Sequence, residues 1–201
     1  MSYTVRLLTP SQKSIPFNVM KSFSDRIKLV AGTEQLWDRI EIFNSSETVV
    51  TTIDRDIVGP ESAGETTLTE LRSVISDKYP VKARQWLDNY FYTVHVIYTF
   101  YIFPDRMDQD AWVLLGGIQD SLKYSLRGVI QVDNEGFYNE AGDYIIYQMY
   151  ENAFGSVPAA VLNDKGQWIS YSLRLGDEKA VDLFQNGIVP KQGFFSKLFR
   201  L

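Results

Sequence analysis

Acidic side chains gather in one stretch of the chain that carries no positive charge. Residues 128–164 contain no Lys or Arg. The acids of this stretch are Asp133, Glu135, Glu140, Asp143, Glu151 and Asp164. Two carboxylates can serve as acid and base in a hydrolase, and carboxylate oxygens are ligands for hard divalent cations. One hypothesis is therefore a carboxylate-dependent hydrolase or a metal-binding enzyme that uses some of Asp133, Glu135, Glu140 and Asp143.

The spacing of these acids does not match a calcium loop. Counted from Asp133, the glycine at Gly136 stands at position 4 and Tyr144 at position 12. The twelve-residue calcium loop instead has glycine at position 6 and Glu at position 12. Asp, Asn and Gly are also the usual residues of tight turns. We therefore expect these acids mainly to form turns, and we expect no bound metal and no cofactor.

Aromatic residues are interleaved with the same acids. They are Phe137, Tyr138, Tyr144, Tyr147, Tyr150 and Phe154. Aromatic side chains bury area at protein interfaces while carboxylates steer a basic partner, so this stretch predicts a surface for a basic, apolar partner. The alternative is that most of these rings pack in the core. The candidate partner contacts are Tyr138, Glu140 and Asp143.

The last residues of the sequence have the opposite character. Residues 190–201 carry three basic and no acidic side chains, so the remaining 189 residues have a formal charge of −8, which is −5 minus +3. The candidate partner contacts here are Phe194, Phe195, Lys197, Leu198, Phe199 and Arg200. This segment either docks on its own domain, binds a partner protein or a second copy, or lies on an anionic membrane. The membrane is the least favoured, because so short a segment binds it weakly.

The sequence contains few groups that serve as nucleophiles or general bases. It has no cysteine, which excludes disulfides, thiolate zinc sites and cysteine nucleophiles. There is no glycine-rich phosphate loop, no dinucleotide-binding turn and no serine elbow. His95 is the one imidazole. It stands in the most apolar stretch of the chain, so we expect a buried or half-buried structural histidine rather than a general base.

Composition indicates one globular domain. The chain has 201 residues, of which 45% are apolar and 22% charged, with a net charge of −5. We expect a single domain over residues 1–190 followed by a basic, apolar tail over residues 191–201. Bulk attraction to nucleic acid is excluded by the negative charge. The longest apolar run, residues 94–103, is short of the about 18 residues of a membrane span. Because the first residues show no apolar leader pattern, we expect the protein to be located in the cytoplasm.

Hydrophobic periodicity predicts the elements that position these groups. Strands are expected over residues 3–8, 36–43, 48–58 and 94–103, the last of them central and buried on both sides. Helices are expected over residues 18–31, from a capping box at Thr67 and Glu70, from Pro80, from a cap at Asp110, and from a cap at Asp177. Residues 129–175 alternate between strand and turn patterns, as in antiparallel hairpins. The predicted fold is α+β, a mostly antiparallel sheet built from hairpins with helices packed on one face.

Two adjacent glycines interrupt the helix expected after Asp110. Gly116 and Gly117 each cost about 1 kcal/mol relative to Ala in a helix interior. One explanation is close packing of the helix on the sheet. The other is a backbone that opens toward a ligand.

Together these patterns favour a non-enzymatic cytoplasmic adaptor or accessory protein. It would bind a protein partner, or a second copy of itself, through the acidic aromatic region and the basic tail. The alternative is the carboxylate-dependent or metal-binding enzyme. Two carboxylates that converge on one point would favour the enzyme, and carboxylates on separate turns would favour the binding protein.

Overall fold

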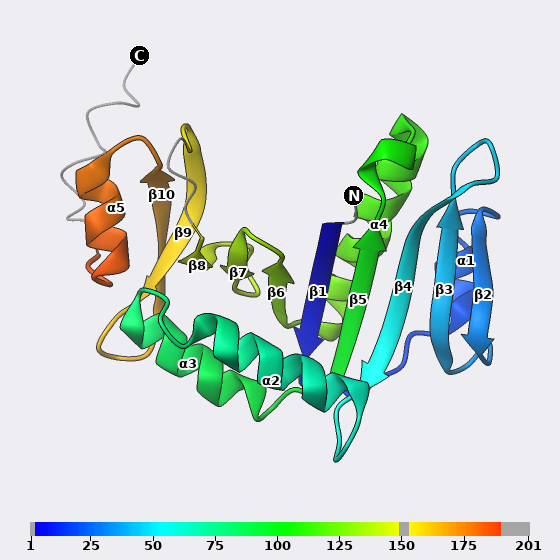
Figure 1. Cartoon of the computed structure of the whole chain (residues 1–201), viewed down its shortest axis with the longest axis horizontal. Helices are drawn as coiled ribbons and strands as arrows, with labels where there is room; N and C mark the ends of the chain where they lie inside the picture. The colour runs from blue at the N-terminus through cyan, green and yellow to red at the C-terminus, as the bar shows by residue number, and fades with distance from the viewer. Residues whose placement is uncertain (1–2, 149–152, 190–201) are drawn as a thin grey trace.

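The chain folds around one ten-stranded sheet. The computed structural model describes residues 3–148 and 153–189. Within these residues the strands are β1 (Tyr3–Thr9), β2 (Ile27–Gly32), β3 (Trp37–Phe43), β4 (Val49–Ile57), β5 (Val96–Ile102), β6 (Val129–Val132), β7 (Gly136–Tyr138), β8 (Tyr144–Tyr147), β9 (Ser156–Leu162) and β10 (Trp168–Arg174). The α-helices are α1 (Phe17–Lys21), α2 (Ala63–Ile75), α3 (Val81–Phe91), α4 (Gln109–Leu126) and α5 (Glu178–Gln185) (Figure 1). A 3-10 turn, η1 (Pro104–Arg106), follows β5.

The strand order is β10-β9-β8-β7-β6-β1-β5-β4-β3-β2. Neighbouring strands pair antiparallel, except that β8 and β9 pair in parallel at Tyr144 and Ala159. β1 lies between β5 and β6 and so joins the first half of the chain to the hairpins of the second half. The mostly antiparallel α+β architecture and the central position of β5 are confirmed.

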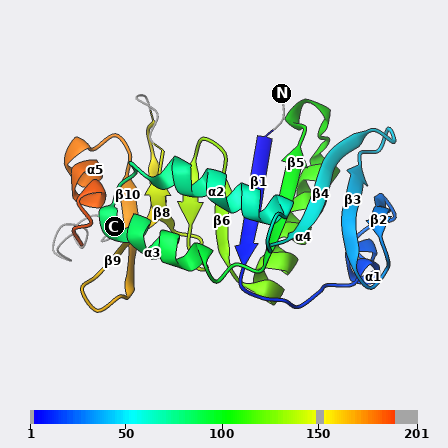
Figure 2. The ribbon, with the colours of Figure 1, turned by 60° about the horizontal axis from the view of Figure 1, so that its bottom comes forward.

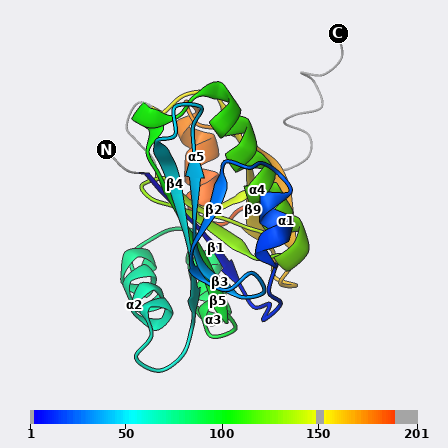
Figure 3. The ribbon, with the colours of Figure 1, turned by 90° about the vertical axis from the view of Figure 1, so that its right-hand side faces the viewer.

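Helices cover both faces of this sheet. Adjacent residues of a strand point to opposite faces, and β1 separates its neighbours Leu7 and Leu8 in this way. Leu7 packs in a cluster with α4, whereas Leu8 packs in a cluster with α2 and α3. Figure 3 shows α2 and α4 on opposite sides of the strands. In Figure 2, α2 and α3 cross over the middle strands. Packing on one face is therefore not confirmed, because strands that are apolar on both sides need cover on both sides.

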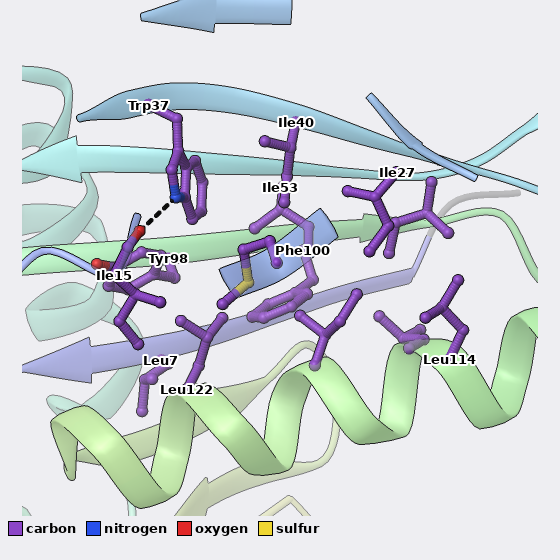
Figure 4. Close-up of a cluster of buried hydrophobic side chains, with 14 of the residues drawn as sticks. Leu7, Ile15, Ile27, Trp37, Ile40, Ile53, Tyr98, Phe100, Leu114 and Leu122 are labelled. Atoms are coloured by element: carbon purple, nitrogen blue, oxygen red, sulfur yellow. Dashed lines mark hydrogen bonds between the residues drawn. The ribbon is translucent and has the colours of Figure 1, made fainter. Parts of the chain in front are cut away.

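The core on the α4 side is built around Trp37, which is fully buried. Its indole N–H donates a hydrogen bond of 2.8 Å to the carbonyl oxygen of Ile15, and its ring packs against Tyr98 with the centroids 5.6 Å apart (Figure 4). The indole donor is thus satisfied inside an apolar cluster, as burial of Trp requires. This bond also ties the loop before α1 to the sheet.

A third cluster joins α5 to the far end of the sheet. Its buried members are Tyr144, Ala159, Val161, Leu173 and Phe184. Cα partners across a strand pair share a face, and the register runs Ile130–Tyr138, Tyr138–Tyr144 and Tyr144–Ala159. Ile130 packs against the α4 cluster. α4 and α5 therefore cover the same face, with β6 and β7 between them.

The helix expected over residues 18–31 is wrong. The helix α1 covers only Phe17–Lys21, and the strand β2 begins at Ile27 and pairs with β3 through Ile27 and Ile42. Met20 and Ile27 are both buried in the cluster on the α4 side, so the apolar spacing correctly indicated which residues are buried. It could not separate one helix from a short helix followed by a strand, because these few apolar positions fit both periods.

Two helices begin earlier in the chain than the capping patterns predicted. α2 begins at a Ser62 cap, whose hydroxyl oxygen accepts from the Glu65 N–H at 3.1 Å, rather than near Thr67. α4 begins at an Asp108 cap rather than at Asp110. The Asp177 cap of α5 is confirmed. In the first two cases a second capping residue within a few positions competed for the same role. Among the described residues, no helix combines the length and apolar character needed to cross a membrane.

Candidate functional site

A pocket opens between α4 and the sheet, on the side of α4 that faces β6 and β7. We call it the α4 pocket, and its volume is about 460 Å³. Its aliphatic and phenylalanine residues from the strands are Val5, Leu7, Phe100, Ile102, Ile130 and Val132. Its α4 residues are Trp112, Leu115, Gly116, Gln119, Asp120 and Lys123, and the remaining lining residues are Tyr3, Glu135, Tyr138 and Gly142. An apolar concavity with a few polar groups is the usual form of a binding site.

Glu135 is the polar centre of the α4 pocket. The Tyr3 hydroxyl donates to one carboxylate oxygen at 3.0 Å. The Tyr138 and Tyr144 hydroxyls donate to the other at 3.0 and 3.3 Å, and these two hydroxyls also contact each other. The three phenols hold the carboxylate in one position, where it can accept further hydrogen bonds or attract a cation.

The same network keeps the tyrosines protonated. Burial is the largest cause that raises the pKa of Tyr144, to about 12, and the charge of Glu135 adds to it. Burial and then Glu135 also raise the pKa of Tyr3. For Tyr138, burial and the Tyr144 hydroxyl raise the pKa ahead of Glu135. At neutral pH these phenols are therefore hydrogen-bond donors rather than bases or nucleophiles.

The open side of α4 is created by one of the two adjacent glycines. A Cβ added at Gly116 would meet no atom within 4 Å, and Gly116 lines the α4 pocket. A Cβ added at Gly117 would lie 3.7 Å from the ring of Phe23. The contact at Gly117 is an ordinary van der Waals distance to a side chain outside the strands, so it does not show the close helix–sheet packing expected for the pair, whereas Gly116 leaves space toward the α4 pocket.

A second hollow adjoins the α4 pocket and shares Asp120 and Lys123 with it. Its other lining residues are Tyr124, Ser125, Arg127 and Glu140. With Glu135 included, the charged groups around the two hollows are three carboxylates and two cations, an excess of one negative charge. The Tyr124 side chain here is 89% exposed. Both apolar and ionic groups are therefore available at this surface.

The predicted partner contacts of the acidic region have different surroundings. Tyr138 lines the α4 pocket and Glu140 is exposed beside it. Asp143 is buried at 8% exposure, where it accepts a hydrogen bond of 2.6 Å from Ser170 and its backbone N–H donates to Asn139. Asp143 therefore holds a turn. The predicted contacts Phe194, Phe195, Lys197, Leu198, Phe199 and Arg200 lie outside the described residues.

The acids proposed for a hydrolase do not meet at one point. Asp133 forms an ion pair of 2.6 Å with Arg6 and accepts from Gln131 at 3.0 Å. Arg6 and Leu8 share a face, opposite the one that holds Glu135. Burial acts to raise the pKa of Asp133, but the hydrogen bonds from Gln131 and Arg6 lower it overall. In residues 3–148 and 153–189, no three Asp, Glu or His side chains are grouped so as to hold a metal ion.

The expectation of a buried or half-buried His95 is wrong. Its side chain is exposed, although both neighbours, Val94 and Val96, are buried. His95 precedes the first residue of β5, where its backbone N–H donates to Thr9 and its carbonyl oxygen accepts from Val58. The apolar residues that follow His95 form β5, but His95 itself lies just before the first residue of that strand, where its side chain is exposed.

Sequence reasoning missed the tyrosine cluster around Glu135. The spacing between Glu135, in the turn before β7, and Tyr138, the last residue of β7, is a local signal that could have been noticed. Tyr3 carries no such signal, since it is 132 positions away.

Comparison of the chain with family models, with curated proteins and with solved structures finds no match. A function for the chain is therefore inferred from the geometry of the α4 pocket and from the chemistry of its lining residues.

Proposed function

We propose that this chain is a non-enzymatic adaptor or accessory protein of the cytoplasm that binds a basic, apolar protein segment at the α4 pocket. The single observation that carries this proposal is the Glu135 carboxylate in the lining of a largely apolar pocket, held by Tyr3, Tyr138 and Tyr144. An apolar side chain of the partner would enter the pocket, and a basic side chain would pair with the carboxylate.

The chemistry of the lining supports such a ligand. Apolar and aromatic side chains supply affinity when they are buried, whereas an ordered carboxylate supplies orientation and charge selection. The volume of about 460 Å³ is within the about 300–1,000 Å³ of binding pockets. Asp120 lines the pocket and Glu140 lies beside it, and both side chains are exposed. Together with Glu135 these carboxylates outnumber the cations Lys123 and Arg127 by one.

The hydrolase alternative lacks comparable support. It needs two carboxylates that face one scissile bond. Asp133 is engaged with Arg6 on one face of the sheet, Asp143 is engaged with Ser170, and Glu135 is on the other face from Asp133. We therefore propose binding as the function.

A peptide that matches the proposed ligand tests this function. Residues 190–201 of the chain itself are basic and apolar, with Lys197 and Arg200 among large apolar residues. The full chain, immobilised at low density, is titrated with this synthetic peptide. We expect saturable binding that weakens as salt rises, because the peptide carries three cations.

Two controls make the outcome specific. A peptide with Lys197 and Arg200 replaced by Glu should bind at least about tenfold more weakly, which is about 1.4 kcal/mol. The protein variant Glu140→Gln should bind slightly more weakly with an unchanged fold, since Glu140 is exposed. Equal binding of both peptides, or no binding at millimolar peptide, would contradict the proposal.

A further inference from the structure

We infer that the cation bound at the α4 pocket is the ammonium group of a lysine side chain, and that the phenols around Glu135 select it over an arginine. This inference rests on the proposed function and names the chemistry of the partner's basic side chain. It requires that the carboxylate has one acceptor position left rather than two, that an apolar stem can reach it, and that the cations of the chain itself do not fill it.

The hydrogen bonds at Glu135 leave room for one more donor. Each oxygen of a carboxylate accepts about two hydrogen bonds. Oε1 accepts from the Tyr3 hydroxyl at 3.0 Å, so one position remains on this oxygen. The hydroxyl oxygens of Tyr138 and Tyr144 lie 3.0 and 3.3 Å from Oε2. These two hydroxyls also contact each other, so together they fill both positions at Oε2, whichever of them donates to it.

This arrangement distinguishes the two basic side chains. The guanidinium of Arg binds a carboxylate best as a planar fork that uses both oxygens, whereas the ammonium of Lys is a compact point charge that needs only one. At Glu135 the second N–H of the fork would meet the Tyr138 and Tyr144 hydroxyls instead of a free position on Oε2. Arg would therefore keep one hydrogen bond and leave other N–H groups without an acceptor, which lowers its affinity.

An apolar surface leads to this carboxylate. Val132 ends β6 and is the Cα partner of Val5 in β1, and both residues line the α4 pocket. The turn that carries Glu135 follows directly, and the Glu135 N–H donates to the Val132 carbonyl oxygen at 3.1 Å. The methylene stem of a lysine can pack on such apolar residues while its charged end reaches a polar partner.

The cations of the chain itself do not pair with Glu135. Lys123 lines the α4 pocket, but its Nζ lies beside Gly142, where a Cβ added to the glycine would be 3.2 Å from it. Within residues 3–148 and 153–189, no Lys or Arg side chain forms an ion pair with Glu135. Because Lys123 and Arg127 offset most of the negative charge around the pocket, the hydrogen bond at Oε1, rather than the net charge, selects the cation.

Two peptides of equal charge test this selection. Both have the sequence of residues 190–201 with an acetylated N-terminus, so that no terminal amine competes with the side chains. The lysine peptide carries Arg200→Lys, and the arginine peptide carries Lys191→Arg and Lys197→Arg, so each has three cations. Isothermal titration calorimetry with the full chain should give the lysine peptide an affinity about tenfold higher, as expected for about one charge-assisted hydrogen bond.

Two protein variants identify the residue responsible. Tyr138→Phe removes one hydroxyl from Oε2 and keeps the ring, which packs on Tyr144 with the centroids 4.0 Å apart. Because Tyr138 lines the pocket, the position that it leaves is accessible to the ligand, and the arginine peptide should approach the affinity of the lysine peptide. Tyr3→Phe is the matched control. It removes a hydroxyl from Oε1 and leaves both hydroxyls at Oε2, so the preference for lysine should remain.

Circular dichroism and thermal melting show whether Tyr138→Phe keeps the fold. If it melts well below the unmodified chain, Glu135→Gln replaces it. The amide has no charge and only one carbonyl oxygen, so both peptides should then bind more weakly and with equal affinity.

Other results separate the inference from the proposed function. Equal affinity of the two peptides for the unmodified chain, or tighter binding of the arginine peptide, would overturn the inference and leave the proposed function intact. A lysine preference that Tyr138→Phe does not reduce would also overturn it, because the phenols at Oε2 would not be its cause. If neither peptide binds at millimolar concentration, the proposed function and the inference both fail.

Discussion

Tyr3 and Glu135 are 132 positions apart in the sequence, yet the Tyr3 hydroxyl donates a hydrogen bond of 3.0 Å to the Glu135 carboxylate. Tyr3 begins β1, and Glu135 lies in the turn between β6 and β7. The bond therefore connects the first strand of the chain to the acidic hairpins. It also holds a carboxylate that lines the α4 pocket, so the local stability of this contact and the proposed binding chemistry depend on the same atoms.

Removing the Tyr3 hydroxyl tests the structural side of this relationship. Tyr3→Phe should lower the free energy of unfolding by about 1 kcal/mol, because one partly buried hydrogen bond is lost while the ring is kept. Glu135 retains the Tyr138 and Tyr144 hydroxyls, so the loss should be no larger. Urea unfolding measures it. Tyr124→Phe, at a side chain that is 89% exposed, should leave the midpoint unchanged, and equal effects of the two variants would contradict the account.

The raised pKa of Tyr144 predicts how stability depends on alkaline pH. In the folded chain this pKa is about 12, against 10.0 for the ordinary phenol, with burial as the largest cause. Between these values the unfolded chain releases a proton that the folded chain keeps. Stability from this group is therefore complete below pH 10 and declines as pH rises through about 12.

Urea unfolding at several pH values between 9 and 12 measures this decline. Tyr144→Phe should make the decline shallower, because one of the groups responsible is gone. Glu135→Gln should also make it shallower, since the carboxylate charge contributes to raising the pKa values of Tyr144 and Tyr3. An unchanged slope in Tyr144→Phe would show that this phenol titrates normally.

Asp143 and Glu140 should behave differently although they are close in sequence. Asp143→Ala removes the acceptor for Ser170, so we expect a loss of about 1–3 kcal/mol in unfolding free energy. Glu140→Ala, at an exposed side chain, should change it by less than about 0.5 kcal/mol. Thermal or urea unfolding of the two variants compares them. A larger effect at Glu140 would mean that the turn is held by other contacts.

Two glycines allow a matched test of the backbone. Gly116→Ala should stabilise the chain by up to about 1 kcal/mol, because the site is helical and open. Gly136→Ala should destabilise it by about 1–3 kcal/mol or more, because Gly136 has a φ of +127° and an added Cβ would overlap the carbonyl oxygen of Ile146. Melting temperatures of the two variants should therefore move in opposite directions.

Local patterns predicted most of the strands, because alternation and turn residues act over a few positions. The hairpin between β9 and β10 follows from residues 163–166, and the buried β5 follows from its continuous apolar run. Residues 18–31 were misassigned because Met20 and Ile27 are buried by two different elements that share one apolar spacing. Whether helices pack on one face of the sheet or on both depends on which strands become neighbours. The periodicity of a single segment does not contain that information.

The site was predicted only in its charge and composition. Tyr138 and Glu140 were identified from the acidic, aromatic pattern, and both are at the α4 pocket or beside it. The roles of Tyr3 and Gly116 arise from long-range packing of β1 and α4 against the hairpins. Asp143 belongs to the same acidic, aromatic pattern, but its side chain is buried and holds a turn instead of lining the pocket.

The affinity of the full chain for the peptide of residues 190–201, compared with that of its Glu135→Gln variant, tests most directly whether the α4 pocket binds a basic, apolar segment. Glu135 lines the pocket, and the variant removes its charge while keeping the size of the side chain. The unmodified chain should bind the peptide saturably, and Glu135→Gln should bind it about tenfold more weakly with an unchanged circular dichroism spectrum. Equal affinity of the two forms, or no binding by the unmodified chain, would contradict the account.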